Sequence, residues 1–431
     1  MKKYFKETVK YILRSKIFIH KYIVEIDELY NMSPTELKLR NEKVFLNIFK
    51  EAYNKSPFYH KLYTEHGIKI SDIKCLEDIN KLPIITKDMI KRHADEIPTK
   101  SKYKLIKNHT SGTTGTPLTV YEDWPSIWRE QAYFYCYRKR CGYEYGKDII
   151  ASLRGHLDRN TNSLYINISK TLFLSSYNLS DKVIQEYFIL LKKYKPQAIE
   201  GYPSSLYNLA RLLEKNNFDI TIPLAFTSSE TLDINKRQYI ERILHTKIFD
   251  HYGNTERTIR LEETKEHDGY YEDPGYSINE YKTEHIITTS LINSSFPMIR
   301  YRVDDIIQLK ANAKRESVTE PTIQGIDGRT TDCIIGLDGT NFSGAALTYF
   351  AKAIPNIQTV QLIQSKIGYM DICIVPNKEF TKKDNEDISN VVDKIFGFNN
   401  INYIIKIIEP ADLQYSKNGK LSLVVSYRDK K

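Results

Sequence analysis

Residues 108–120, NHTSGTTGTPLTV, are unlike the rest of the chain and decide how it is interpreted. Between Thr110 and Pro117 this stretch has two glycines, five hydroxyl side chains and no charged side chain. A loop of this kind offers backbone N–H groups and hydroxyls that can approach a polyphosphate closely. It is not the common phosphate loop G-x-x-x-x-G-K-[ST], because the spacing differs and no lysine follows the second glycine. A flexible hairpin turn is the alternative that the composition leaves open.

Composition and charge restrict the class of protein. A chain of 431 residues, 41% hydrophobic and 27% charged, predicts a soluble globular protein of two or three domains. The net charge of +9 is spread among acidic residues rather than gathered in a stripe, so no nucleic-acid partner is expected. Five scattered cysteines favour a reducing cytoplasm over a disulfide framework. No segment resembles a signal peptide or an integral membrane span.

Helical and strand patterns alternate between residues 181 and 250. Helices are expected at 181–193, 204–215 and 233–244, and short apolar strands at 198–201, 223–229 and 247–250. Such βα units predict a partly parallel sheet covered by helices, with ligands beyond the carboxyl ends of the strands. The two loops at 227–231 (TSSET) and 251–256 (HYGNTE) are therefore expected beside a ligand. A helix is also predicted to start after Ser33, with Pro34 in its first turn.

The C-terminal hundred residues have a pattern of their own. Strands are expected in TVQLIQ, MDICIVP, INYIIKII and KLSLVVSY, with a helix at 384–396. This length is enough for a small α+β domain. The sequence therefore predicts an α/β protein in which residues 1–330 form a large domain and residues 331–431 a small one.

Five motifs together resemble the adenylate-forming superfamily of acyl- and aryl-CoA synthetases, luciferases and peptide-synthetase adenylation domains. TSGTTGTP resembles its phosphate loop, DHYGNTE its Y-G-x-T-E motif and IRYRVDD its Y-R-T-G-D motif. GRTTD resembles its hinge motif, and SKNGKLSLVV its C-terminal segment with a glycine–lysine pair. The segments AYNKSPFYHKLYTEHGI, DINKLPIITKDMIK and GYPSS resemble the phenylacetate-CoA ligase group and its relatives named for capsular polysaccharide biosynthesis. With them the resemblance covers most of residues 33–428.

The resemblance implies roles for the phosphate loop and for three residues outside it. The β- and γ-phosphates of ATP would be held by Ser111, Gly112, Thr113, Thr114, Gly115 and Thr116. Thr255 would bond the α-phosphate, and Glu256 would hold Mg²⁺. Lys420 would swing in on a mobile C-terminal domain to neutralise charge on the α-phosphate. Its alternative is an ordinary lysine beside the hairpin turn at 418–419.

The resemblance also implies an adenosine site. Tyr252 would stack on adenine beside Gly253, and the residues bordering the base would be Ser228, Ser229 and Glu230. Asp305 would accept hydrogen bonds from the two ribose hydroxyls, and Arg329 would reach the ribose or phosphate as a permanent cation. Val303 and Asp304 depart from the family pattern, which has Thr and Gly there. Because of this departure, weaker or modified nucleotide binding remains an alternative.

Three functions remain as alternatives. The first is ATP- and Mg²⁺-dependent acid activation followed by transfer to CoA, as in phenylacetate-CoA ligases. The second transfers the acyl group to an amine, such as an amino sugar of a surface polysaccharide, and the third is nucleotide binding without catalysis. Candidate residues for the acid pocket lie at 133–145, at Tyr177 and at 201–203, although such stripes are more often core. Cytoplasmic location is expected, and a homodimer is left open.

Overall fold

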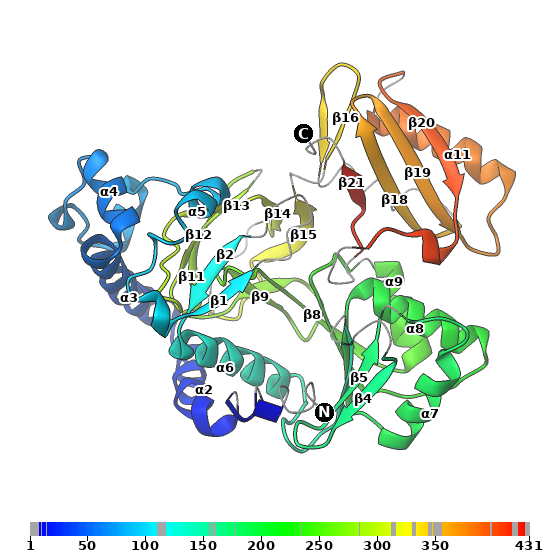
Figure 1. Ribbon diagram of the computed structural model, residues 1–431, viewed down its shortest axis with the longest axis horizontal. Helices are drawn as coiled ribbons and strands as arrows, with labels where there is room; N and C mark the ends of the chain where they lie inside the picture. The colour runs from blue at the N-terminus through cyan, green and yellow to red at the C-terminus, as the bar shows by residue number, and fades with distance from the viewer. Residues whose placement is uncertain are drawn as a thin grey trace.

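The computed structural model describes residues 8–9, 11–13, 15–109, 118–154, 157, 161–176, 178–232, 234–283, 285–311, 316–329, 333–343, 347, 356–396, 399–415 and 421–426. It confirms the predicted α/β class. A large helix-covered part with a partly parallel sheet is followed by a smaller α+β unit (Figure 1). No described helix is long and apolar enough to cross a membrane.

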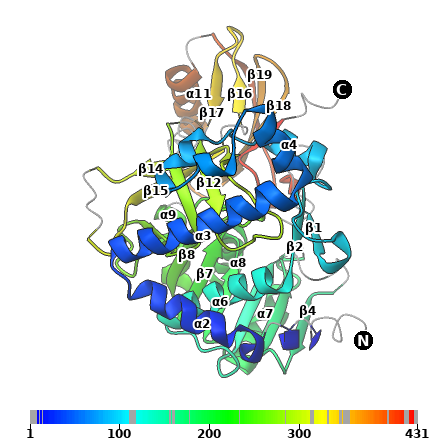
Figure 2. The same cartoon turned by 90° about the vertical axis from the view of Figure 1, so that its left-hand side faces the viewer.

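The N-terminal helices pack at one side of the large part (Figures 1 and 2). As predicted, Ser33 starts a helix, because its hydroxyl accepts the Glu36 N–H and the Glu36 carboxylate accepts the Ser33 N–H at 2.9 Å. The helices here are α2 (Lys16–Tyr30), α3 (Pro34–Lys55), α4 (Pro57–Glu65) and α5 (Lys87–His93), with short 3₁₀ turns at η1 (Ile70–Asp72), η2 (Leu76–Lys81) and η3 (Lys102–Lys104).

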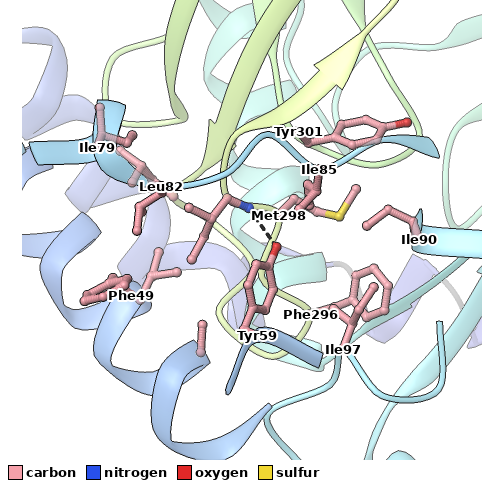
Figure 3. Close-up of a cluster of buried hydrophobic side chains, with 14 of the residues drawn as sticks. Phe49, Tyr59, Ile79, Leu82, Ile85, Ile90, Ile97, Phe296, Met298 and Tyr301 are labelled. Carbon is pink, nitrogen blue, oxygen red and sulfur yellow. Dashed lines mark hydrogen bonds between the residues drawn. The ribbon is translucent and has the colours of Figure 1, made fainter. Parts of the chain in front are cut away.

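A buried apolar cluster joins these helices to the strands behind them (Figure 3). At its centre Tyr59 is fully buried, and its hydroxyl donates to the Pro297 carbonyl at 3.0 Å and accepts the Ile299 N–H at 3.0 Å. Because a buried hydroxyl without partners is costly, these two bonds fix the helix against the chain that leads into Tyr301.

A ten-stranded sheet forms the centre of the large part, in the order β14-β15-β10-β9-β8-β7-β6-β3-β5-β4. The five adjacent strands β8, β7, β6, β3 and β5 run parallel, as the alternating pattern predicts. The strands are β3 (Ile150–Arg154), β4 (Ser163–Ile166), β5 (Thr171–Ser175), β6 (Ala198–Gly201), β7 (Leu224–Ser228), β8 (Lys247–Gly253), β9 (Arg260–Glu263), β10 (Tyr270–Glu272), β14 (Asp305–Leu309) and β15 (Ile323–Arg329).

Helices cover both faces of the parallel strands. On one face, α7 (Ile184–Tyr194), α8 (Pro203–Lys215) and α9 (Ile234–Leu244) share an apolar core with the strands. On the other face lies α6 (Trp124–Arg140), whose Tyr137 packs with Ala198, Phe226 and Phe249. We call this side of the sheet the α6 face. Ligand-binding residues at the strand ends can project from either face.

Smaller sheets complete the described structure. β1 (Ile106–His109) pairs with β2 (Thr119–Glu122), and β11 (Ser277–Tyr281), β12 (Ile286–Ser290) and β13 (Tyr301–Val303) form a three-stranded sheet. β16 (Cys333–Ile335) pairs with β17 (Asn341–Ser343). The C-terminal sheet has the order β20-β19-β18-β21, and its members with their helices are β18 (Ile357–Lys366), β19 (Tyr369–Pro376), β20 (Asn402–Ile407), β21 (Val424–Ser426), α11 (Lys382–Phe396) and η4 (Pro410–Asp412).

The C-terminal sheet has its own apolar core. Val360, Leu362, Ile372 and Ile374 of its two central strands pack against Ile388 and other residues of α11. All the strands predicted for this region are present, and α11 begins two residues before the predicted start. In Figure 1 this unit lies above α8 and α9 of the large part.

Candidate active site

The glycine-rich stretch begins and ends on a β-hairpin. His109 at the end of β1 pairs with Thr119 at the start of β2, so the two ends of the intervening loop are held together. This pairing agrees with both the phosphate-loop and the hairpin-turn interpretations. The predicted phosphate ligands themselves lie outside the described residues: Ser111, Gly112, Thr113, Thr114, Gly115 and Thr116.

A second loop presents Thr255 and Glu256. The Asn254 amide donates to the Thr258 hydroxyl at 2.7 Å, and the Asn254 side-chain oxygen accepts the Thr258 N–H at 2.9 Å. These two bonds close the loop at its base, so Thr255 and Glu256 lie at its tip. Thr255 is exposed and Glu256 is half-buried.

A buried ion pair joins this loop to the hairpin. Arg257 Nε lies 2.5 Å from a carboxylate oxygen of Glu122 on β2, whose side chain is only 2% exposed. Glu122 also accepts a hydrogen bond from Asn108 on β1. The residue after Glu256 is therefore fixed to both strands that carry the glycine-rich loop. Two motifs that lie about 140 residues apart in the sequence are neighbours in the structure.

The Y-R-x-x-D motif meets the same loop from another strand. Tyr301 on β13 donates to Glu256 Oε1 at 3.2 Å, and Tyr252 on β8 donates to Asp305 at the start of β14. Arg329 pairs with Asp305 through the backbone of β15. Of the predicted adenosine ligands, Tyr252, Asp305 and Arg329 are thus brought together.

One expectation for this region needs correction, and the two departures from the family pattern can be placed. The stretch 251–256 was expected to be a loop, but its first residues belong to β8, which runs to Gly253 because they pair with β9. Tyr252 therefore projects from a strand. Val303 is buried at 9% exposure in the apolar cluster of Tyr59, and Asp304 accepts from Arg302 Nε at 2.8 Å. Both departures from the family pattern have local structural roles.

The loop after β7 contacts both the large part and the C-terminal unit. Ser228 is buried and accepts from Arg154 Nη2 at 2.9 Å, while Ser229 has a positive φ of 70°. The Glu230 carboxylate accepts the Ser204 N–H at 3.0 Å and the Leu421 N–H at 3.0 Å. The chain immediately after Lys420 thus reaches the predicted nucleotide loop.

Lys420 itself lies outside the described residues, but its neighbourhood is defined. Leu421 forms a bridge to Tyr415, and both line a small crevice with Ser204, Tyr207 and Asn208 of α8. Burial and the nearby Glu230 carboxylate raise the pKa of the Tyr415 hydroxyl. The C-terminal unit therefore touches the large part beside the carboxyl end of β7.

Apart from Ser228 and His251, which lie in the two loops expected beside a ligand, the polar side chains on the α6 face were missed by the sequence interpretation. We call Arg138, Ser152, Arg154, Glu200, Ser228 and His251 the polar cluster. They lie at the carboxyl ends of β3, β6, β7 and β8 and on the facing side of α6. The available signal was a glutamate inside the apolar strand AIEG and the polar residues of ASLR.

The aromatic residues named as candidates for the acid pocket have mainly structural contacts. Tyr133 donates to the Pro274 carbonyl at 2.7 Å, and Tyr137 donates to the Asp250 carbonyl at 3.1 Å. Both rings are almost completely buried. They agree with the core alternative, and Tyr177 lies outside the described residues.

Burial also shifts the pKa values of two side chains on β8, Asp250 and His251. Burial raises the pKa of Asp250 to about 6, although Thr227 donates to its carboxylate at 2.6 Å and Tyr270 at 2.8 Å. Burial, followed by the charge of Arg260, lowers the pKa of His251 well below its usual range. The imidazole is therefore neutral at physiological pH.

Comparison with known proteins agrees with this geometry. Residues 334–427 match the family described as CapK C-terminal domain. The chain is 25% identical to Protein CapK of Staphylococcus aureus over 89% of this chain and 87% of that protein. It is 25% identical to a phenylacetate-coenzyme A ligase of Pseudomonas putida over 66% of this chain and 69% of that protein.

A solved structure shares the fold. A crystal structure of 2-hydroxyisobutyryl-CoA ligase in the postadenylation state, in complex with 2-HIB-AMP, superposes with a TM-score of 0.70 at 16% identity. The match covers 92% of this chain and 91% of that one. This likeness shows the fold. The sequence relatives and the C-terminal family match, with the five motifs, show that the chain belongs to the adenylate-forming superfamily. It is an enzyme of the ligase class, with relatives among CapK and the phenylacetate-CoA ligases.

Proposed function

We propose that this enzyme activates a carboxylic acid with ATP as an acyl-adenylate, releases pyrophosphate, and transfers the acyl group to CoA. The observation that carries the proposal is the linkage of separate motifs around one loop. Glu256 meets Tyr301, Arg257 meets Glu122 at the base of the glycine-rich loop, and Leu421 meets Glu230. Such an arrangement can hold adenosine, phosphates and a C-terminal lysine around one reacting centre.

Each part of the nucleotide is assigned to particular residues. Ser111, Gly112, Thr113, Thr114, Gly115 and Thr116 would donate to the β- and γ-phosphates, and Thr255 to the α-phosphate. Tyr252 would stack on adenine, with Gly253, Ser228, Ser229 and Glu230 around the base, and Asp305 and Arg329 would bind the ribose. Tyr252 is half-buried, Asp305 is buried, and the Tyr252 hydroxyl donates to the Asp305 carboxylate, an arrangement that suits a flat base over a diol.

Glu256 would hold Mg²⁺. A carboxylate at a loop tip fits a hard cation, and no described group of three or more His, Cys, Asp or Glu could form an all-protein cage. Phosphate oxygens and water would therefore complete the coordination. When bound, the ion would offset the negative charge of the phosphates. Lys420 would neutralise charge developing on the α-phosphate, and positioned donors of this kind are a large part of catalysis in such sites.

The second candidate is transfer of the acyl group to an amine, such as an amino sugar in surface polysaccharide assembly. It is favoured by the similarity to Protein CapK over nearly the whole chain and by the CapK C-terminal domain match. Both candidates share the adenylation step and the residues assigned to it. We place both reactions in the cytoplasm, where ATP and CoA are available, and leave homodimer formation to be tested.

Pyrophosphate release tests the proposal. The purified protein is assayed with MgATP and a panel of carboxylic acids, with CoA, with an amino sugar, or with neither. Acid-dependent release that is accelerated by CoA supports the first candidate, and acceleration by the amino sugar supports the second. If the protein binds nucleotide but releases no pyrophosphate with any acid, only the third alternative remains, a nucleotide-binding protein without catalysis.

A further inference from the structure

The polar cluster lies next to the proposed nucleotide site. Ser228 belongs both to the cluster and to the predicted adenine loop, and His251 directly precedes Tyr252 on β8. In the sheet, Ser152 pairs with Glu200, and Ser228 pairs with His251. An acid that reacts with the α-phosphate must extend from the nucleotide into adjoining protein. The polar cluster is the adjoining surface on the α6 face.

Charges within the cluster do not balance. Arg138 of α6 pairs with the Glu200 carboxylate, which also accepts from Ser152 at 2.7 Å. Arg154 forms no ion pair with any carboxylate of the described chain. Its guanidinium donates to the Ser228 hydroxyl at 2.9 Å and lies 5.7 Å from the centre of the Tyr202 ring. Since an arginine is always charged, the cluster holds one cation in excess.

Buried nitrogen atoms of the cluster also lack partners. His251 is 7% exposed and Arg138 is 9% exposed. Within the described residues, His251 Nδ1, Arg138 Nε and Arg154 Nε have no hydrogen-bond partner. Most buried polar atoms in proteins are hydrogen-bonded, and leaving one unpaired destabilises the fold. Three such atoms on neighbouring side chains indicate a place where a polar ligand completes the bonding.

We infer that the acid substrate carries a second anionic group and that Arg154 binds it, beside the imidazole of His251. This inference rests on the proposed function and specifies its substrate class. A planar guanidinium binds a carboxylate in two parallel hydrogen bonds, which a hydrocarbon cannot form. A purely apolar acid would cover the cluster and leave its nitrogens without water or partners. Arg138 is not assigned this role because Glu200 already neutralises it.

The test is acid-dependent exchange of pyrophosphate into ATP with matched acids. Butyrate is compared with succinate and with succinamate, and phenylacetate with 4-carboxyphenylacetate. The wild-type enzyme is expected to prefer the dianionic member of at least one set by about 10- to 100-fold in kcat/KM, the range of a charge-assisted hydrogen bond. Arg154→Met should abolish this preference without changing the KM for ATP. Arg154→Lys, which keeps the charge, should retain part of it.

Control variants separate the outcomes. Arg242→Met removes an exposed arginine paired with Glu214 and should leave acid selectivity unchanged. Exchange that is equally fast with mono- and dianionic acids overturns this inference but leaves adenylation intact. The inference is also overturned if Arg154→Met raises the KM for ATP and leaves the acid selectivity unchanged, because Arg154 would then contact the nucleotide. No exchange with any acid would overturn the proposed function itself.

Discussion

The two halves of the candidate site differ in how complete they are. On the nucleotide side, polar groups of separate motifs bond to one another, as Glu256 does to Tyr301 and Asp305 to Tyr252. In the polar cluster, His251 Nδ1 and two arginine nitrogens have no partner among the described residues. The nucleotide side is therefore assembled by the protein itself. The cluster has donors left for a ligand, so it is the half that can select the substrate.

The largest effect is expected from Lys420→Ala. If Lys420 neutralises charge on the α-phosphate, its removal should slow adenylation by about 100- to 1,000-fold, as the loss of a transition-state donor does. Transfer from a preformed acyl-adenylate should be nearly unchanged. Single-turnover measurements of each half-reaction provide the comparison. Lys406→Ala, which removes an exposed ion pair with Asp371, is the matched control.

Equal loss of both half-reactions in Lys420→Ala would contradict this role. It would show that the lysine supports the structure or the acceptor rather than the nucleotide side.

Arg257→Met should weaken the framework of the nucleotide side. Glu122 would remain buried without its cation, and an uncompensated buried charge costs about 3 kcal/mol of unfolding free energy. Urea denaturation measures the change. Arg242→Met breaks an exposed pair with Glu214 and should cost less than about 1 kcal/mol. If the two variants were equally stable, the buried pair would not be what holds the loop to the hairpin.

Asp305→Ala should weaken nucleotide binding more than Tyr252→Phe does. The aspartate would lose charged hydrogen bonds to the ribose, which raises the KM for ATP by about 10-fold or more. The tyrosine variant loses only its hydroxyl and keeps the stacking ring, so the KM should change by less than about 3-fold. Steady-state kinetics at saturating acid give both values. Equal changes would indicate that the Tyr252–Asp305 bond, rather than a ribose contact, explains the effect of Asp305.

Asp250 predicts a pH dependence of stability. Its pKa rises to about 6 in the folded protein because of burial, so the folded state holds a proton that the unfolded state has lost above about pH 4. The unfolding free energy should therefore fall as pH rises from about 4 to 6, by about 3 kcal/mol in total. Asp250→Asn should remove this fall. Urea denaturation of both proteins across this range is the measurement. An unfolding free energy of the wild type that rises with pH relative to that of Asp250→Asn would contradict the assignment.

The two halves also differ in how well the sequence predicts them. The nucleotide residues lie in short contiguous motifs, and the βα alternation places two of those motifs at strand ends. The resemblance of these motifs to the adenylate-forming superfamily therefore predicted Tyr252, Glu256 and Asp305 around one nucleotide, although β8 extends three residues into the expected loop. The same alternation predicted the parallel strands and their helices.

The polar cluster could not be predicted in this way. Arg138, Arg154 and Glu200 come from one helix and two strands, each within a segment that otherwise looks like core, and of the main cluster residues only His251 and Ser228 belong to loops expected beside a ligand. Only the pairing of β3 with β6 and of β7 with β8, with α6 laid across them, brings these residues together. The sequence offered the aromatic residues of α6 as candidates, with core as the more frequent alternative, and those residues mainly fill the core.

A crystal structure with a non-hydrolysable ATP analogue and Mg²⁺ would show whether the separate motifs surround one nucleotide. Adenine is expected beside Tyr252, the ribose on Asp305, the phosphates facing residues 111–116 and the metal at Glu256. A nucleotide bound elsewhere, with residues 111–116 turned away from its phosphates, would contradict this arrangement.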